Sequence, residues 1–354
     1  MENSHKVVLA LPVTSANNNH ATRSMKSLSE DANAAQGKLK KSVFLIDCKP
    51  LWGCSSVRGW RSEMEDAYMV VPGFIKVPIW MLTKEPKIEG IDNMDAFKVT
   101  AHFFGVYDGH GGTQVANYCR ARIHLALTEE LNKIEAANSK ENIDFDLKKK
   151  WERAFTHCFQ KVDEESMLVA PETVGSTALV AVVSSSHIIV ANCGHSRAVL
   201  SRGKQAIPLS FDHKPKREEE YARIEAQGGR FVLDLLAMSR SLGDNYLKPW
   251  MIPIPEITIL PCAKDDNCLI LASDGLWDVV SNEEACDLAR KKIMVWRKKN
   301  GTMASSENFE TYCDHAAQSA AESLLKLALL KGSKDNITVM VVDLKSKWKF
   351  KSNP

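Results

Sequence analysis

The apolar residues of this chain fall in short, mostly unbroken segments, and this pattern constrains the fold more than any other feature. The segments lie at His102–Tyr107, Thr177–Val183, His187–Asn192, Cys268–Ser273 and Ile337–Val342. A strand with one solvent-facing side alternates polar and apolar residues, so unbroken runs of this length indicate strands that are covered on both faces. Three serines separate the second run from the third, which indicates a tight antiparallel connection.

Helical periodicity lies between the groups of expected strands. The segment Leu147–Val162 places its apolar residues on one helical face. A second helix is expected to begin at Ser281, because Glu284 follows three residues later in a capping-box pattern. A third apolar stripe covers Ala317–Ala328, and Gly332 is a candidate C-cap. Strands in runs, with helices in pairs between them, predict an α+β fold in which antiparallel sheets are covered by helices.

The same patterns divide the chain into one domain and two tails. We expect a single domain over residues 51–344, because no strong linker interrupts it. Residues 1–45 are expected to form a disordered N-terminal tail, since Thr14–Lys41 is rich in Asn, Ser, Ala and Lys without periodicity. Residues 345–354 form a basic C-terminal tail.

Less regular segments of the domain lead to two weaker expectations. Shorter helices should follow Gly112 and Pro215. The segments Lys84–Ala96 and Ala136–Asp146 are polar and lack periodicity, so they are expected to be surface loops.

Composition argues against several classes of protein. Among 354 residues, 46 Lys and Arg stand against 44 Asp and Glu, and a net charge of +2 argues against nucleic acid as the main ligand. No stretch approaches the ~20 apolar residues of a membrane helix, so no membrane partner is expected. The nine cysteines are scattered and never spaced C-x-x-C, which excludes a zinc ribbon and favours a reducing compartment over a disulfide framework.

Acidic residues flank the expected strands at one kind of position. Asp108 and Asp274 each end an apolar run, Asp335 stands just before one, and the pair Glu65-Asp66 lies beside a further expected strand. If these strands are neighbours, their ends gather carboxylates whose mutual repulsion a divalent cation would relieve. Oxygen ligands without a Cys or His cluster point to Mg²⁺ or Mn²⁺. Each Asp-Gly pair is also typical of a turn, and the residues alone leave both interpretations open.

Six motifs then occur in an order that is specific to one family. They are Arg61–Asp66 (RSEMED), Val106–Gly112 (VYDGHGG), Gly175–Ala178 (GSTA), Leu236–Asp244 (LAMSRSLGD), Ala272–Asp278 (ASDGLWD) and Gly332–Asn336 (GSKDN). From about Leu51 to Leu344 the chain resembles metal-dependent Ser/Thr protein phosphatases of type 2C. Tyr221–Glu225 and Leu247–Pro249 are similar to the plant branch that serves as abscisic-acid co-receptors. The resemblance implies two antiparallel β-sheets that form a sandwich flanked by helix layers (α-β-β-α).

The resemblance also implies a centre of two Mg²⁺ or Mn²⁺ ions. Asp108 would bridge the two ions, and the Gly109 carbonyl would bind one of them. Asp274 and Asp335 would complete the protein ligands of the other ion.

Four further residues would act around the implied ions. Glu65 and Asp66 would hold metal-bound waters. Arg61 would bind the substrate phosphate through its planar guanidinium, and His110 would donate a proton to the departing Ser or Thr oxygen. The implied reaction is direct attack by a hydroxide that bridges the two ions, without a phospho-enzyme. Without the motifs, an arginine would be taken as a solvated surface residue and a lone histidine as structural.

One departure from the family concerns a third, weaker metal position. The family usually has Asp in the motif that here reads Asn192-Cys-Gly-His195-Ser-Arg197, and that Asp acts with the residue at Asp278. Imidazole is a poorer partner for Mg²⁺ than carboxylate, so His195 puts occupancy of the third site in doubt. The alternative is that His195 only makes hydrogen bonds in a turn.

A second departure lies between Gly228–Val232 and Leu235–Arg240. Relatives carry an extra strand-sized stretch there, which in the co-receptor branch contains a tryptophan that contacts the hormone-bound receptor. Here only Leu233-Asp234 joins the two segments. Loss of a strand would leave ladder hydrogen bonds unpaired near the active site. A splice or gene-model artefact, a genuine variant blind to the receptor, and an impaired phosphatase retained as a binding protein remain alternatives.

These observations lead to one main functional hypothesis and two alternatives. The main one is a phosphatase that hydrolyses phosphoserine and phosphothreonine in proteins as a negative regulator in plant abscisic-acid and stress signalling. A catalytically impaired decoy that binds kinases or receptors is the main alternative. The carboxylates would also suit a two-metal phosphodiesterase or nuclease, but the sequence shows no basic groove that would bind a nucleic acid.

Partners and location follow from the same hypothesis. Expected partners are phosphorylated proteins, kinases among them, and hormone receptors whose binding is weakened by the missing Trp segment. The chain is expected to be a monomer in the nucleus and cytoplasm. The basic runs Arg290–Lys292 and Arg297–Lys299 are interpreted as a solvated helix face, with a nuclear-import signal as the alternative.

Overall fold

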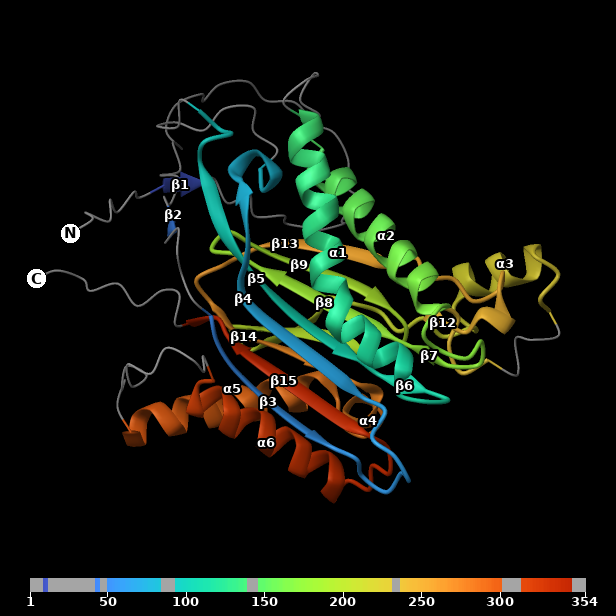
Figure 1. The fold of residues 1–354 in the computed structure, drawn as a ribbon. Coiled ribbons are helices and arrows are strands. Elements are labelled where there is room, and N and C mark those ends of the chain that lie inside the picture. Colours follow the sequence, from blue (N-terminus) through green and yellow to red (C-terminus); the bar gives the residue numbers. More distant parts are fainter. Residues whose placement is uncertain are drawn as a thin grey trace, which may run out of the picture.

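The structure is a computed structural model of the chain. It describes residues 9–11, 42–44, 50–83, 93–138, 146–230, 236–300 and 313–345. Two five-stranded sheets face each other, with a pair of long helices on the outer face of each (Figure 1). The predicted α-β-β-α sandwich is therefore confirmed.

The first sheet has the strand order β13-β9-β8-β5-β4, and each neighbouring pair is antiparallel. Its strands are β4 (Ala67–Pro78), β5 (Lys98–Tyr107), β8 (Ala178–Val183), β9 (His187–Cys193) and β13 (Glu256–Pro261). Helices α1 (Gln114–Asn138) and α2 (Leu147–Ser166) cover its outer face. The expected serine turn joins β8 to β9, where Ser184 N donates to His187 O at 2.9 Å.

The second sheet has the order β11-β10-β14-β15-β3 and is antiparallel throughout. Its strands are β3 (Leu51–Val57), β10 (Arg197–Arg202), β11 (Gln205–Pro208), β14 (Asp266–Ala272) and β15 (Ile337–Asp343). Helices α5 (Asn282–Asn300) and α6 (His315–Leu330) cover its outer face.

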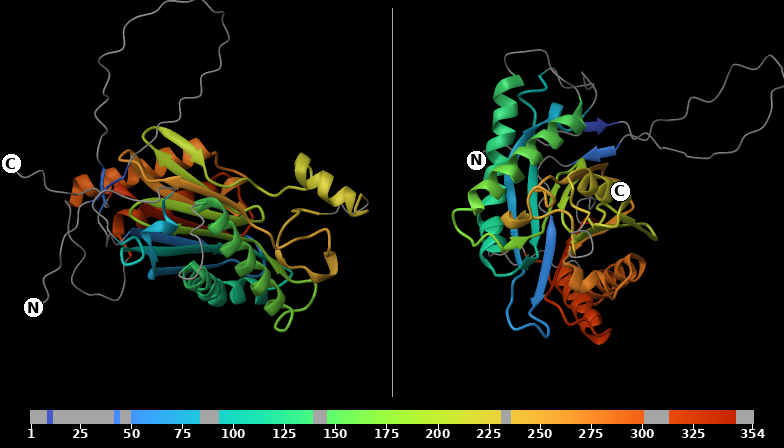
Figure 2. Two further views of the ribbon diagram at one scale, coloured as in Figure 1. Left: turned by 90° about the horizontal axis from the view of Figure 1, so that it is seen from above. Right: turned by 90° about the vertical axis from the view of Figure 1, so that its right-hand side faces the viewer.

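Shorter elements gather at one end of the sandwich, on the right in Figure 1. A small antiparallel sheet is formed by β6 (Gly109–His110), β7 (Gly175–Ser176) and β12 (Leu242–Gly243). The one-turn helix α4 (Asp274–Trp277) follows β14, and α3 (Glu218–Ala226) projects from the same end (Figure 2). Two 3₁₀ segments lie at Ile79–Met81 and Asn245–Leu247.

Three hydrophobic cores explain why the strand segments are unbroken. One core lies between the first sheet and α1–α2, one between the two sheets, and one between the second sheet and α5–α6. Successive side chains of a strand point to opposite faces, so Phe103 packs toward the helices while Phe104 packs between the sheets. Ile270 and Leu271 divide in the same way in the second sheet. The prediction of strands covered on both faces is confirmed.

The helix boundaries follow the expected capping signals. Asp146 caps α2 by accepting from the backbone N of Lys148, and Ser281 Oγ accepts from the backbone N of Glu284 at 3.2 Å. Gly332 follows α6 with φ of +89°. A helix does follow Pro215, as α3.

The expectation of a short helix after Gly112 is wrong, because α1 has 25 residues. It extends through Asn138 into the segment that was expected to begin a loop at Ala136. Apolar side chains spaced three or four residues apart hold it against the first sheet and α2, at Val115, Cys119, Ile123, Ala126, Leu127 and Leu131. The rest of that expected loop up to residue 145, and most of the expected loop Lys84–Ala96, lie outside the described residues.

The tails are described only in part. Strands β1 (Leu9–Leu11) and β2 (Ser42–Phe44) pair antiparallel within the segment expected to be a disordered N-terminal tail. The remaining residues of 1–45 lie outside the described part, as do those after Lys345, so the division into domain and tails stays a prediction. Among the described residues, no helix combines the length and apolar character that crossing a membrane requires.

Candidate metal and catalytic centre

The antiparallel topology brings the acidic motifs to one edge of the sandwich. Asp108 directly follows β5, and Glu65-Asp66 directly precedes its partner β4, whose Ala67 pairs with Tyr107. In the second sheet, Asp274 follows β14, and Asp335 precedes the neighbouring β15. Neighbouring antiparallel strands begin and end at the same edge, so each pair of motifs must meet there. The prediction that these strand ends lie together is confirmed.

The tightest group of possible ligands contains the unexpected histidine. Within the described ranges, a cluster of His, Cys, Asp or Glu with ligand atoms within 4.8 Å of one another is formed by Asp108, His195 and Asp274. His195 Nδ1 lies 3.5 Å from Asp108 Oδ2 and 3.4 Å from Asp274 Oδ2. The turn between β9 and β10 brings it there.

Three carboxylates at this edge, those of Asp66, Asp108 and Asp274, have raised pKa values. Burial raises the pKa of Asp108 well above its usual range, and the charges of Asp66, Asp274 and Asp335 raise it further. Burial likewise raises the pKa of Asp66 to about 6 and that of Asp274. Ionised carboxylates in such a place repel one another unless a cation lies between them.

Unsatisfied atoms at the same edge fit a bound cation. Asp108 Oδ2, Asp66 Oδ1 and His195 Nδ1 are buried and have no hydrogen-bond partner among the described residues. Buried polar atoms in proteins are nearly always bonded, so unbonded ligand atoms that face each other, as His195 Nδ1 and Asp108 Oδ2 do, indicate a missing partner. Oxygen donors predominate, which suits Mg²⁺ or Mn²⁺.

Segments beside β14 and β15 of the second sheet hold Glu65 and Asp66 in place, and Gly109 lies against Glu65. Ser273 Oγ donates to Asp66 Oδ2 at 2.8 Å, and the backbone N of Glu65 donates to Asn336 Oδ1 at 2.7 Å. At Gly109 a Cβ atom would stand 2.5 Å from the Glu65 carbonyl oxygen, so only glycine permits this approach of β6 to the Glu65-Asp66 segment.

Arg61 lies on the rim of the cluster and contacts one of the expected ligands. Its Nη2 donates to Asp335 Oδ2 at 2.6 Å, and 59% of its side chain is exposed. The Asp335 carboxylate raises the pKa of the guanidinium further. Arg61 can therefore reach a bound anion at the edge of the cluster, while Asp335 stands outside the tight group and its role as a ligand stays a prediction.

His110 has a partner that sequence reasoning missed. Its Nε2 donates to both carboxylate oxygens of Asp244, at 2.9 and 2.8 Å. Ser241 Oγ donates to Asp244 Oδ2 at 2.5 Å. Asp244 is the last residue of the motif Leu236–Asp244, and its place in that motif is the sequence signal that could have identified it. The structure shows that its side chain is buried.

Of the two residues proposed for a third metal, only His195 belongs to the tight group of possible ligands within the described residues. Asp278 is exposed and lies one turn after Asp274 at the end of α4, and it is not a member of the tight group. His195 instead faces Asp108 and Asp274. The third site stays a prediction.

The motif Leu236–Asp244 is held in place by hydrogen bonds although the segment before it is shortened. Residues 231–235 lie outside the described part. Beyond them, Ser239 N donates to His213 O at 2.8 Å, and Arg240 Nη2 donates to Glu220 Oε1 of α3 at 2.5 Å. Burial alone would raise the pKa of Glu220, but hydrogen bonds from Arg240 and Arg223 outweigh it and lower the pKa to about 2. The motif therefore reaches β12 and places Asp244 against His110.

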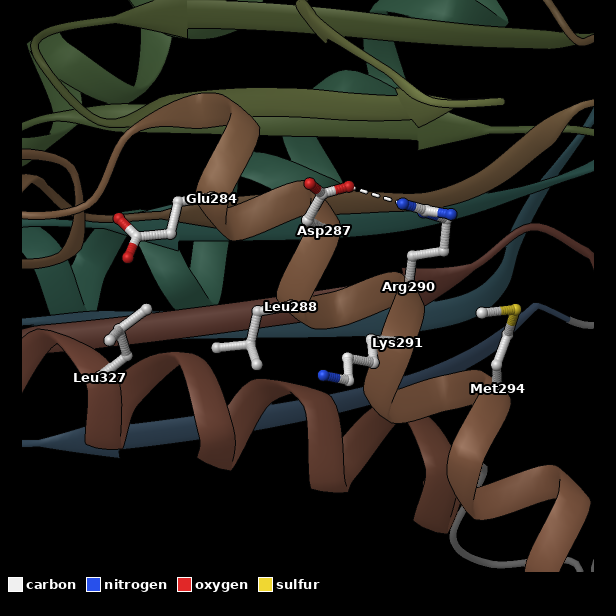
Figure 3. A pocket seen from close by; sticks show the side chains of 7 residues that line it. All are labelled: Glu284, Asp287, Leu288, Arg290, Lys291, Met294 and Leu327. Atoms are coloured by element: carbon white, nitrogen blue, oxygen red, sulfur yellow. Dashed lines mark hydrogen bonds and ion pairs between the residues drawn. The ribbon is translucent and has the colours of Figure 1, made fainter.

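A separate hollow of about 650 Å³ lies between α5 and α6 (Figure 3). Leu288 and Met294 of α5 and Leu327 of α6 line it together with charged side chains. None of the residues predicted to be catalytic or metal-binding lines it.

Comparison with known proteins agrees with this geometry. A sequence model described as "Protein phosphatase 2C" matches residues 52–337. The chain belongs to the protein phosphatase 2C family. This phosphatase is 60% identical over 345 residues to "Probable protein phosphatase 2C 6" of Oryza sativa subsp. japonica, covering 93% of this chain and 73% of that protein. It is 52% identical over 347 residues to "Protein phosphatase 2C 7" of Arabidopsis thaliana, covering 91% and 67% respectively.

Solved structures share the fold of this phosphatase. Serine-threonine phosphatase 2C from Toxoplasma gondii superposes with a TM-score of 0.62 at 21% identity, covering 83% of this chain and 95% of that one. A C. elegans sex determining protein superposes with a TM-score of 0.61 at 20% identity, covering 84% and 65%. The family membership establishes a metal-dependent Ser/Thr protein phosphatase that uses Mg²⁺ or Mn²⁺.

Proposed function

We propose that this phosphatase dephosphorylates protein kinases and acts as a negative regulator in plant abscisic-acid and stress signalling. The observation that carries the catalytic part is the group formed by Asp108, His195 and Asp274, with Arg61 at its rim. The signalling part is supported by the segments Tyr221–Glu225 and Leu247–Pro249 and by the high identity to rice and Arabidopsis phosphatases.

The residues around the cluster divide the work of phosphate-ester hydrolysis. Bound Mg²⁺ or Mn²⁺ supplies a nucleophile from water at neutral pH and neutralises charge on the phosphoryl oxygens. Asp108 and Asp274 would hold the ions, and Arg61 would bind phosphate oxygens through its guanidinium. Asp244 accepts from His110 Nε2, so the proton for the departing Ser or Thr oxygen would come from Nδ1 of a His110 ring that is protonated on both nitrogens.

Two observations bear on the decoy alternative. The carboxylates that would bind metal are present, and the shortened segment leaves the His110–Asp244 pair intact. A decoy would need none of these groups to be held in place. We therefore favour an active enzyme over a binding protein without turnover.

Release of inorganic phosphate from a phosphothreonine peptide in Mn²⁺ tests the catalytic proposal. We expect turnover by the wild-type chain and its loss in Asp108→Asn and Asp274→Asn. Asp287→Asn removes a carboxylate from the exposed face of α5 and is the matched control, which should keep full activity. No release by folded wild-type protein would support the decoy, and full activity of Asp274→Asn would overturn the assignment.

Adding an abscisic-acid-loaded receptor to the same assay tests the signalling proposal. We expect weaker inhibition than that of a relative that keeps the Trp-containing stretch. Equal inhibition would contradict the expectation. If kinases are the natural substrates, phosphopeptides taken from plant protein kinases should be hydrolysed faster than unrelated phosphopeptides.

Residence in the nucleus and cytoplasm is proposed as well. Arg290 bonds to Asp287, and Arg297 bonds to Asp343 with only 16% of its side chain exposed. The two basic runs on α5 are therefore partly engaged in ion pairs, which favours their interpretation as a helix face. A fluorescent fusion in plant cells, with Lys298→Ala and Lys299→Ala, would test whether the second run directs import.

A further inference from the structure

The turn that carries His195 is fixed to the backbone beside Asp108. Ser196 Oγ lies 2.9 Å from Thr177 Oγ1, and that same Thr177 oxygen accepts from the backbone N of Asp108 at 3.1 Å. Gly194 has φ of +121°, and a Cβ there would stand 2.6 Å from the Thr177 side chain. The position of His195 relative to Asp108 is therefore set by the fold.

The imidazole presents one nitrogen to two carboxylates. His195 Nδ1 is 3.5 Å from Asp108 Oδ2 and 3.4 Å from Asp274 Oδ2. Both separations exceed the 2.7–3.2 Å of an ordinary N–H···O hydrogen bond. Ligand atoms at adjacent corners of an octahedron lie roughly 3 Å apart when each is about 2.1 Å from the ion. The two separations at His195 Nδ1 thus suit ligands that share an ion, and all three ligand atoms lie within 4.8 Å of one another.

The buried atoms without hydrogen-bond partners also support a shared ion. His195 Nδ1 and Asp108 Oδ2 are both buried and have no hydrogen-bond partner among the described residues. Only 13% of the His195 side chain and 15% of that of Asp108 are exposed. A histidine that served only the turn would have bonded this nitrogen to a turn carbonyl.

We propose that His195 is a nitrogen ligand of the divalent ion held by Asp108 and Asp274, and that it makes this centre prefer Mn²⁺ to Mg²⁺. Mg²⁺ is a hard ion that takes oxygen ligands, whereas imidazole nitrogen favours transition-metal ions. The inference rests on the metal-dependent function but adds a ligand and a selectivity that the usual Asp at this position would not give.

Electron spin-echo spectroscopy of bound Mn²⁺ tests the ligand directly. With one Mn²⁺ equivalent, the wild-type protein should show ¹⁴N modulation from a coordinated imidazole, and His195→Asp should lose it. His157→Gln, on the exposed side of α2, is the matched control and should keep it. Wild-type protein without ¹⁴N modulation, or a signal that persists in His195→Asp, would overturn the proposal.

Metal binding by calorimetry tests the selectivity without turnover. The ratio of the Mg²⁺ dissociation constant to that of Mn²⁺ should fall about tenfold in His195→Asp, on the scale by which ligand environments alter metal affinity. His195→Gln keeps the size but offers no imidazole, and it should also lose the ¹⁴N signal if His195→Asp fails to fold. An unchanged ratio in a folded variant contradicts the selectivity.

The outcomes separate this inference from the proposed function. Wild-type protein that binds Mn²⁺ with ¹⁴N modulation but releases no phosphate would refute the catalytic proposal and support the ligand. Wild-type protein that releases phosphate but shows no ¹⁴N modulation would support the catalytic proposal and refute the His195 ligand. At limiting Mg²⁺, His195→Asp should release phosphate faster than the wild type, and an equal or slower rate counts against the selectivity.

Discussion

His110 and Asp244 lie 134 positions apart in the sequence, yet His110 Nε2 bonds both carboxylate oxygens of Asp244. The small sheet formed by β6, β7 and β12 makes this contact possible, because β6 ends at His110 and β12 ends immediately before Asp244. Asp163 of α2 accepts from the backbone N of Gly243 at 2.8 Å and fixes the approach. Such a pair orients the imidazole and occupies Nε2, so the ring can donate a proton from Nδ1 only when both of its nitrogens are protonated.

Replacement of Asp244 by Asn should impair proton donation to the leaving group. Asn keeps the size of Asp and tolerates the φ of +47° at this position, but its neutral amide lacks the negative charge that would balance a ring protonated on both nitrogens. We expect kcat for a phosphothreonine peptide to fall by about 100-fold, the lower end of what general acid catalysis contributes. For p-nitrophenyl phosphate, whose leaving group needs no proton, the loss should be much smaller.

The two substrates act as each other's control in this experiment. Ser241→Ala removes only the hydroxyl that donates to Asp244 and should give a milder loss of the same kind. Equal losses on both substrates in Asp244→Asn would mean that the pair supports the structure of the site rather than proton transfer.

The sequence predicted the layers of the fold because both faces of each central strand are apolar. Phe103 and Phe104 illustrate this, since adjacent residues serve different cores. The length of α1 was missed because part of the helix is polar. Arg122 of α1 donates to Glu165 of α2 at 2.9 Å, so the contact between the two helices depends partly on ion pairs that an apolar pattern does not reveal.

The sequence motifs predicted which residue types form the candidate site, but not all of the contacts between them. Asp108 and Asp274 could be placed together because each ends a strand. The contact of His195 with both depends on the tie between Ser196 and Thr177, which is a tertiary contact without a periodic signal. The Asp244 contact depends in the same way on strands of only two residues, which are too short to give a pattern.

Asp108→Asn should stabilise the metal-free protein while abolishing activity. Burial and three neighbouring carboxylates raise the Asp108 pKa, so its ionised form costs folding free energy at neutral pH. The neutral amide removes that cost, and in EDTA we expect an increase in unfolding free energy of about 1–3 kcal/mol, the scale of an unsatisfied buried polar group. Urea unfolding followed by circular dichroism measures it.

The response to metal supplies the check on Asp108→Asn. Adding Mn²⁺ should stabilise the wild type and have much less effect on the variant, because the ion then lacks a ligand. Lower stability of the variant in EDTA would show that Asp108 is stabilised by its neighbours rather than strained by them.

The stability of the metal-free protein should rise as the pH falls from about 7.5 to 5. Asp66 has a folded-state pKa of about 6, raised by burial from 3.8, so the folded state binds its proton more tightly than the unfolded state does. Its destabilising effect is complete above the folded pKa and decreases progressively between that pKa and the unfolded value of 3.8, because only the folded state holds the proton there. Asp66→Asn should flatten this part of the profile in EDTA, and an unchanged profile in the variant would assign the effect to other groups.

Gly59→Ala should displace Arg61 from the rim of the site. Gly59 has φ of +64°, and a Cβ there would stand 2.1 Å from the Asp335 carbonyl oxygen, against which the loop is held by Trp60 N donating to Lys334 O. The left-handed conformation alone costs alanine about 1–2 kcal/mol, and the clash must move the loop as well. We expect a raised KM for phosphopeptides together with a loss of stability. Gly228→Ala is the matched control, because its φ is +73° and nothing lies within 4 Å of the added Cβ. It should lose a similar amount of stability from the backbone alone and keep its KM, whereas a raised KM in both variants would assign the effect to general destabilisation rather than to the position of Arg61.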